Sequence, residues 1–167
     1  MLSECVFCRE VEGQSSSIFK RSADGLWAAR WDPYPALPGH AEVIPVRHVN
    51  MFMDLSPDEL KGKELFVREV MGAIARIEPA DLYEEMLSRM YGGADPMSRL
   101  LIETAHFKSP RGSFVIDGWT LAVNDGEAAG RTVGHFHQHI IPRKEGDVVN
   151  SRGGFRRMFA DDPYCQQ

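Results

Sequence analysis

Alternating apolar and polar residues predict strands near both ends of the chain. The Asp24-Gly25 pair between the first two of these stretches is a strong hairpin signal. The predicted strands cover residues 16–20, 26–31, 42–46, 114–116, 119–123 and 135–141.

A helical period replaces this alternation in the middle of the chain. Ser56 is suited to cap a helix, Pro57 fits its first position, and Glu59 completes a capping box. Apolar residues then recur at helical spacing and mark the buried stripe, which consists of Phe66, Val70, Ile74 and Ile77.

Two further helices are predicted between residues 79 and 112. Leu82, Met86 and Met90 step by four residues and indicate a helix that ends at Gly92 and Gly93. A third helix is predicted from residues 95–96 through about residue 104. Repeats and domain boundaries are not evident, so residues 1–167 are expected to form a single domain, with residues 144–167 as a tail without clear periodicity.

Three of the six histidines occupy alternate positions in the last predicted strand. Side chains of a strand point to opposite faces in turn, so His135, His137 and His139 share one face, while Phe136 and Ile140 share the other. Imidazole can act as a nucleophile, a proton donor or a metal ligand near neutral pH. Structural histidines are the plain alternative, but the strict alternation favours a catalytic or metal-binding face.

The composition is that of an ordinary globular protein. Hydrophobic residues make up 43% of the chain and charged residues 26%. The net charge of −5 argues against general nucleic-acid binding, which needs a basic surface, although local arginines can still attract a small anion. No apolar run is long enough to span a membrane and no signal peptide is evident, which predicts a cytoplasmic protein without a membrane partner.

Cys5 and Cys8 are separated by two residues, the spacing of half a tetrahedral zinc site. Two histidines further along the chain would complete such a site. A redox pair is less favoured because no βαβ pattern surrounds the motif, and two buried thiols without further function are the remaining alternative. The odd number of cysteines, three, excludes a complete disulfide framework and indicates a reducing compartment.

Two loops have the composition of ligand-binding segments. Residues 32–40 contain three prolines, which leave little conformational entropy to lose when the loop holds a ligand, although a plain connector is the alternative. Residues 124–133 contain glycines that let backbone N–H groups approach an anion. Arg131 in this second loop adds a bidentate donor suited to phosphate.

In these motifs the chain resembles the histidine triad (HIT) family of nucleotide hydrolases and transferases, in particular its zinc-bearing bacterial-type branch. The resemblance rests on Cys5, Cys8, residues 32–40, Val43-Ile44-Pro45, His48 and residues 124–143. It implies an α+β fold, with a roughly five-stranded antiparallel sheet and helices packed on it. It also implies a homodimer.

The resemblance further implies a mechanism. His137 matches a nucleophile that attacks the α-phosphorus of a nucleotide and forms a nucleotidyl-histidine, which water then hydrolyses to a nucleoside monophosphate. His135 and His139 flank the phosphorus, and His40 lies behind the triad. The implied substrate contacts are Asn124, Arg131 and Thr132 to the phosphates, Asp32 to the ribose hydroxyls, and Phe7 and Trp31 as walls for the base.

Zinc is the one cofactor that the resemblance implies. Its ligands would be Cys5, Cys8, His48 and His135, and the metal would be structural because four protein ligands close the site to metal-bound water. No organic cofactor is expected.

Three departures from the family pattern carry expectations of their own. Arg131 stands where glutamine is usual and should strengthen attraction to highly charged leaving groups. Gln138 replaces a usually apolar residue, so it should have a hydrogen-bond partner or lie exposed at an edge or dimer contact. Residues 79–112 are longer than in compact relatives and are expected to be a helical insertion.

The leading hypothesis is a hydrolase of dinucleoside polyphosphates or nucleoside phosphoramidates. His139 favours hydrolysis, because nucleotidyl-transferring branches often carry glutamine there. A nucleotidyltransferase or phosphorylase of the same family is the first alternative, and a nucleotide-binding regulatory module is the second. An oxidative metal centre is ranked last because few carboxylates lie near the triad in sequence.

Overall fold

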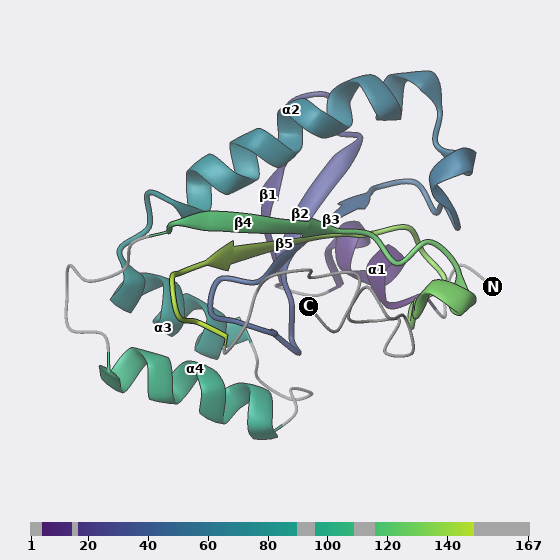
Figure 1. The fold of residues 1–167 in the computed structure, drawn as a ribbon. Coiled ribbons are helices and arrows are strands. Elements are labelled where there is room, and N and C mark those ends of the chain that lie inside the picture. Colours follow the sequence, from purple (N-terminus) through teal and green to yellow (C-terminus); the bar gives the residue numbers. More distant parts are fainter. Residues whose placement is uncertain (1–4, 15–16, 90–95, 109–115, 149–167) are drawn as a thin grey trace, which may run out of the picture.

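Five antiparallel strands form a single sheet in the computed structural model, which describes residues 5–14, 17–89, 96–108 and 116–148 (Figure 1). The order across the sheet is β1-β2-β3-β5-β4. This arrangement, with helices packed against it, confirms the expected α+β fold. The strands are β1 (Ile18–Arg21), β2 (Trp27–Trp31), β3 (Ala41–Pro45), β4 (Gly118–Ala122) and β5 (Gln138–Arg143).

Helices and helical turns connect these strands. Helix α2 lies over the sheet, α1 lies near one end of it, and α3 and α4 lie towards the other end (Figure 1). They are α1 (Val6–Arg9), η2 (Glu10–Gln14), η3 (Phe52–Asp54), α2 (Pro57–Ile74), α3 (Pro79–Arg89), α4 (Pro96–Lys108) and η4 (Glu127–Ala129).

Local signals in the sequence set several of these elements. The β1–β2 hairpin turns at Gly25, which has a positive φ of 72°, and Asp24 Oδ1 accepts the backbone N–H of Leu26. The predicted capping box of α2 is confirmed, since Ser56 Oγ accepts from Glu59 N while the Glu59 carboxylate accepts from Ser56 N.

The helical segment after α2 follows the prediction in outline. Helix α3 contains Leu82 and Met86 on its buried side, but the predicted end at Met90, Gly92 and Gly93 lies outside the described residues. Helix α4 ends at Lys108, four residues beyond the expected end at Thr104. In the stripe of α2, Ile77 lies past the end of the helix, which is Ile74, and still packs against the core.

Only one residue of the strand expected at residues 114–116 can be compared with the structure, and it does not belong to a strand. Residues 114 and 115 lie outside the described part, and Ile116 is not in a strand. Strand β4 begins instead at Gly118, and Val123 lies after its end.

The sheet separates two hydrophobic clusters. The larger one lies under α2 and α3 and includes Trp27, Trp31, Phe66 and Phe136. The smaller one lies on the α1 side and consists of Phe7, Val11, Ala28 and Ile44, with partly buried apolar neighbours. All residues of β2 and β3 are buried, because both faces of these central strands are covered.

The predicted histidine strand is shorter than expected, but its alternation is confirmed. Strand β5 begins at Gln138, so His135 and His137 precede it. Phe136 N donates to Val49 O instead of joining a strand ladder. Phe136 and Ile140 nevertheless pack in the larger cluster, as the alternation requires.

Gln138 has a hydrogen-bond partner, which is one of the two outcomes predicted for it. It is buried, and its Oε1 accepts a hydrogen bond of 2.7 Å from Lys63 Nζ of α2. Because this partner comes from the α2 side, Gln138 points away from the histidines. The larger cluster and this polar contact together fix the strand that carries the triad against α2.

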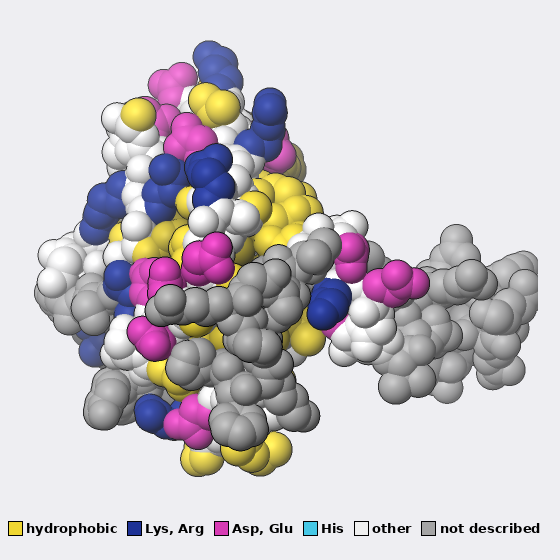
Figure 2. All heavy atoms as spheres, turned by 90° about the vertical axis from the view of Figure 1, so that its left-hand side faces the viewer, with side chains coloured by type: hydrophobic (Ala, Val, Ile, Leu, Met, Phe, Trp, Pro, Cys, Tyr) yellow, Lys and Arg dark blue, Asp and Glu magenta, His cyan; other side chains and the backbone are white. Residues whose placement is uncertain are grey.

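Charged side chains are interspersed on the surface shown in Figure 2, and no extended basic area is visible among the described residues there. Within the described ranges, no helix combines the length and apolarity that a bilayer span requires.

Candidate active site and metal centre

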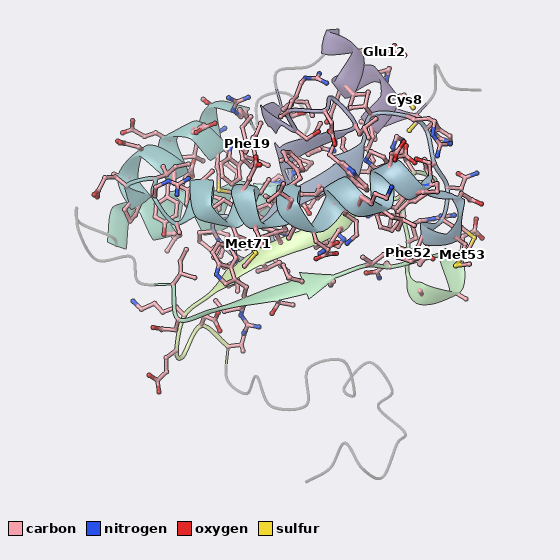
Figure 3. All side chains as sticks on the ribbon, turned by 90° about the horizontal axis from the view of Figure 1, so that it is seen from above. Cys8, Glu12, Phe19, Phe52, Met53 and Met71 are labelled. Carbon is pink, nitrogen blue, oxygen red and sulfur yellow. The ribbon has the colours of Figure 1, made fainter. Side chains whose placement is uncertain are left out.

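The short helix α1 brings the two cysteines of the N-terminal motif together with two distant histidines. Cys5 Sγ lies 3.4 Å from His135 Nδ1, and Cys8 Sγ lies 3.2 Å from His48 Nδ1 and 3.6 Å from His135 Nδ1. All four potential ligand atoms lie within 4.8 Å of one another. Cys8 places this cluster at one end of the molecule when it is seen from above. Phe52 and Met53 lie towards the same end, and Met71 lies towards the other (Figure 3).

These distances fit a tetrahedral zinc ion. With Zn–S near 2.3 Å and Zn–N near 2.05 Å, a tetrahedral angle separates sulfur from nitrogen by about 3.6 Å. The donor set of two thiols and two imidazoles is also one that zinc prefers. The remote nitrogen of His135, Nε2, lies 3.0 Å from Pro45 O and must donate to it, which directs the Nδ1 lone pair at the cysteines.

Burial in this cluster disfavours charge in the absence of a metal. Burial, together with the neighbouring Cys5, raises the pKa of the Cys8 thiol to about 11. Burial also lowers the pKa of His135 to about 4, so that its imidazole is neutral near pH 7. A neutral imidazole is the form that binds a metal.

His137 is held in an orientation suited to nucleophilic attack. Its Nδ1 lies 2.8 Å from the backbone oxygen of His135, which only accepts, so Nδ1 carries the proton and Nε2 carries the lone pair. Burial lowers the pKa of His137, and the positive charge of Arg131 acts in the same direction. The result is a neutral imidazole with a free nucleophilic nitrogen.

His40 and His139 form a directed pair behind His137. His40 Nδ1 accepts from Ala36 N at 3.1 Å, so its Nε2 carries the proton and donates to His139 Nδ1 at 2.9 Å. His139 therefore carries its own proton on Nε2. Burial lowers the pKa of His40, and it lowers that of His139 to about 4, with His40 adding to the effect. The predicted place of His40 behind the triad agrees with this geometry.

Close packing of the proline-rich loop on β5 places His40 beside His139. Gly39 has a φ of 84°, and a Cβ there would lie 2.8 Å from Pro142 Cγ. Asp32 N donates to His40 O and closes the loop. A side chain at residue 39 would therefore push the loop away from β5.

Asp32 lies next to this histidine pair. Its Oδ2 is 3.3 Å from His40 Nε2 and 3.8 Å from His139 Nδ1, and its Oδ1 accepts from Tyr34 N. Phe7 contacts the histidines edge-on, with ring centroids 5.6 Å from His135 and 5.2 Å from His137. Asp32 and Phe7, two of the predicted substrate residues, thus lie beside the histidine row.

The glycine-bearing loop folds back on itself through Asn124, whose side-chain Nδ2 donates to Ala129 O at 2.6 Å. Arg131 Nη1 donates to the backbone oxygen of Asn50, and the cation is close enough to influence His137. Thr132 is exposed. The loop therefore brings one cation, Arg131, to the histidine row.

Trp31 does not lie beside the histidines, where a wall for the base was expected. It is 2% exposed and stacks on Phe19 at 4.0 Å, and its Nε1 donates to Glu85 of α3. Side chains alternate along β2, so Trp31 faces the large cluster while Arg30 faces the histidine side. Both faces of β2 are buried, so Trp31 packs in the large cluster although it is next to Asp32 in the sequence.

Three charged residues on the histidine side were not predicted. Arg30, Glu10 and Glu42 are all buried, and Arg30 lies over the Phe7 ring at 5.0 Å. The period-two pattern contained a signal for two of them, because Arg30 and Glu42 are charges inside otherwise apolar strand segments. Such residues are rarely buried without partners.

Comparisons with known proteins identify the family of this chain. The profile of the HIT domain family matches residues 18–146.

The chain belongs to the HIT family.

An uncharacterized HIT-like protein of Mycobacterium tuberculosis is 27% identical over 95% of this chain and 83% of its own length. An adenylylsulfatase of Arabidopsis thaliana is 29% identical, covering 93% of this chain and 60% of its own length. An asymmetrical bis(5'-nucleosyl)-tetraphosphatase of Schizosaccharomyces pombe is 31% identical, over 79% and 52%. The chain thus spans little more than half of these two enzymes.

Solved structures of the HIT family share the fold. A Zn-bound histidine triad family protein of Mycobacterium smegmatis superimposes with a TM-score of 0.57 and is 26% identical, with 90% of this chain and 82% of that one covered. A metal-bound relative and a Cys/Cys/His/His cluster in this HIT chain are consistent with each other.

Proposed function

We propose that this HIT protein is a nucleotide hydrolase that cleaves its substrate at the α-phosphorus through a covalent nucleotidyl-histidine on His137. The observation that carries the proposal is the hydrogen bond from His137 Nδ1 to the backbone oxygen of His135, which leaves Nε2 as a free nucleophile. A module that only binds nucleotides needs no nucleophile in this orientation.

In the first step the His137 Nε2 lone pair forms a bond to the α-phosphorus, and the bond from phosphorus to the leaving group breaks. The leaving group departs with the electron pair. The imidazole becomes positively charged, and the His135 carbonyl oxygen that accepts from Nδ1 stabilises that charge. The Nε2 proton of His139, which the His40 hydrogen bond leaves in place, can donate to an oxygen on the phosphorus.

In the second step water attacks the same phosphorus, and Nε2 departs with its electron pair. This regenerates neutral His137 and releases a nucleoside monophosphate, with one proton passing to solvent. Splitting the displacement into two steps makes each one easier, because the positively charged adduct releases His137 as a neutral imidazole, which is a good leaving group. Burial favours the return of His137 to its neutral form.

We propose zinc as a structural cofactor held by Cys5, Cys8, His48 and His135. When bound, zinc would hold α1 against the segment that leads into β5. Its chemistry is that of a cross-link, because four protein ligands leave no position for a reacting water. His135 is two residues from His137, so the site would fix the backbone that carries the nucleophile.

The site and the relatives together support one substrate class. A nucleotide with a good leaving group on the α-phosphate fits a single nucleophile, as in a dinucleoside polyphosphate, an adenylyl amine or adenylyl sulfate. The adenylylsulfatase and tetraphosphatase among the relatives support this class. The cation of Arg131 near His137 favours substrates whose leaving group is highly charged.

The direct test is to trap the intermediate. Zinc-loaded protein is mixed with adenylate-labelled diadenosine tetraphosphate, adenylyl sulfate or adenosine phosphoramidate and quenched in base. An acid-labile label on the wild-type chain and none on His137→Ala is expected, with the variant losing at least about a thousandfold in kcat. The variant's zinc content and melting curve show that it is folded, and cleavage that survives in folded His137→Ala would refute the proposal.

Transfer of the nucleotidyl group to phosphate is the second candidate within the family. His139 with its Nε2 proton is equally placed whether water or phosphate accepts the nucleotidyl group. Analysis of the reaction products therefore distinguishes the two activities. Adding inorganic phosphate leaves the monophosphate product unchanged in a hydrolase, whereas a phosphorylase would release a nucleoside diphosphate. We also expect the protein to be cytoplasmic and to form a homodimer. Equilibrium sedimentation would test the homodimer.

A further inference from the structure

Glu42 lies at the centre of the histidine face, although no catalytic role was expected for it. It pairs in register with Arg30 on β2 and with His139 on β5, so the three side chains form a cross-strand row. Glu42 is 5% exposed. A carboxyl group buried to this degree normally has hydrogen-bond partners for its oxygens.

One carboxyl oxygen of Glu42, Oε2, lacks a hydrogen bond from the described part of the chain. Its Oε2 is 3.5 Å from Arg30 Nη1 and has no hydrogen-bond partner among the described residues, while Oε1 is 3.9 Å from His139 Nδ1. Asp32 approaches the same nitrogen to 3.8 Å. Two carboxyl groups thus lie within 4 Å of one imidazole nitrogen.

The nearest cation belongs to another carboxylate. Arg30 Nε is 2.9 Å from Glu10 Oε2, which also accepts a hydrogen bond of 2.6 Å from Ser17 Oγ. Glu10 is therefore the closer of the two carboxylates to Arg30, in an ion pair whose geometry does not make a hydrogen bond from Nε. One guanidinium shared with Glu10 does not offset the burial of a second negative charge on Glu42.

The groups around Glu42 act on its proton in opposite directions. Burial raises the pKa of Glu42 to about 8, and the charges of Asp32 and Glu10 contribute to the increase, while Arg30 opposes it. His137 and His139, the histidines that face Glu42, are neutral near pH 7 because burial lowers the pKa of each.

We propose that Glu42, in its protonated form, is a positioning residue that keeps His139 in the tautomer with its proton on Nε2. This inference rests on the proposed function of His139 as a donor to the phosphate. A neutral carboxyl group does not attract a proton to Nδ1, whose lone pair therefore stays available to the His40 donor. Ionised Glu42 at 3.9 Å would add a second negative charge to that of Asp32 at 3.8 Å. Together they would favour a proton on Nδ1, remove it from Nε2 and repel the anionic substrate.

Kinetics gives the first test. The wild type and Glu42→Gln, which is neutral at every pH, are compared in kcat and KM from pH 6 to 10, with Glu69→Gln on α2 as an exposed control. We expect wild type and control to lose at least about fivefold in kcat above pH 8. Glu42→Gln should stay within about twofold of wild type at pH 7 and should lack this loss. The same alkaline loss in Glu42→Gln would overturn the inference.

Nuclear magnetic resonance tests the inference without turnover, so its failure can be told apart from that of the proposed function. The side-chain carboxyl ¹³C signal that disappears in Glu42→Gln is expected to titrate near pH 8, and ¹⁵N shifts should show His139 protonated on Nε2 at pH 7. Raising the pH to 9.5 should shift that tautomer in the wild type only. Titration of Glu42 near pH 4, or an identical His139 response in both proteins, would refute it.

Discussion

The contact between Lys63 and Gln138 offers a quantitative test of how α2 holds the triad segment. Lys63 Nζ donates to Gln138 Oε1 at 2.7 Å, and both residues are buried. Glu64 is the other partner of Lys63, at 2.5 Å, but its side chain is 71% exposed. Most of the coupling is therefore expected between α2 and the strand.

Replacing one partner at a time should be costly, and replacing both should not. Lys63→Met leaves Gln138 Oε1 without its donor, at a cost of about 1–3 kcal/mol. Gln138→Leu leaves the buried ammonium with only Glu64, at a similar or larger cost. The double variant puts two apolar groups in contact and should be close to wild type, giving a coupling of about 2 kcal/mol or more.

Urea denaturation of the zinc-loaded protein measures these free energies of unfolding, with equal m values as the check on two-state behaviour. A loss of about 2 kcal/mol corresponds to a fall of roughly 4–8 °C in Tm for a chain of this length. Arg68→Met, an exposed change on the same helix, is the control and should stay within about 0.5 kcal/mol. Single losses that simply add in the double variant would refute the reasoning.

Three further outcomes are expected. Cys8→Ser should lose bound zinc, as measured by metal analysis, and melt roughly 10 °C lower; an unchanged melt would exclude a structural metal. Because burial lowers the pKa of His139 to about 4 in the folded state, the unfolded chain binds the proton first as the pH falls below about 6.5. The free energy of unfolding in urea should therefore fall between pH 6.5 and 4, and it should fall less steeply in His139→Gln. Equal slopes of this free energy against pH in the two proteins would contradict the lowered pKa of His139. Arg131→Gln should reduce kcat/KM for diadenosine tetraphosphate about tenfold more than for adenosine phosphoramidate, and an unchanged ranking would remove Arg131 from leaving-group selection.

Local chemistry in the sequence was enough to predict most of the secondary structure. The Asp24-Gly25 turn, the Ser56 capping box and the apolar stripe of α2 each depend on residues close in the chain, so their physics is contained in a short window. The alternation around His137 worked for the same reason. The strand bounds near β5 were less predictable, because Phe136 bonds to Val49 instead of a neighbouring strand.

The position of Trp31 could not be predicted from the sequence of β2. An alternating pattern identifies faces only when one face is polar, and both faces of β2 and β3 are buried. Nothing within β2 states which face α1 covers. The row of Arg30, Glu42 and His139 likewise depends on register across three strands, which is a property of the assembled sheet.

The sequence by itself determined which chemical groups this protein has and which of them share a side of a strand. It could not determine which nitrogen of each imidazole carries a proton, because those partners come from elsewhere in the chain: Pro45 O for His135 and Ala36 N for His40. Tertiary structure decided that, and it also decided that Glu42 lies buried with Arg30 already engaged by Glu10. Protonation depends on burial and on distances of a few ångströms, and only the folded chain fixes those quantities.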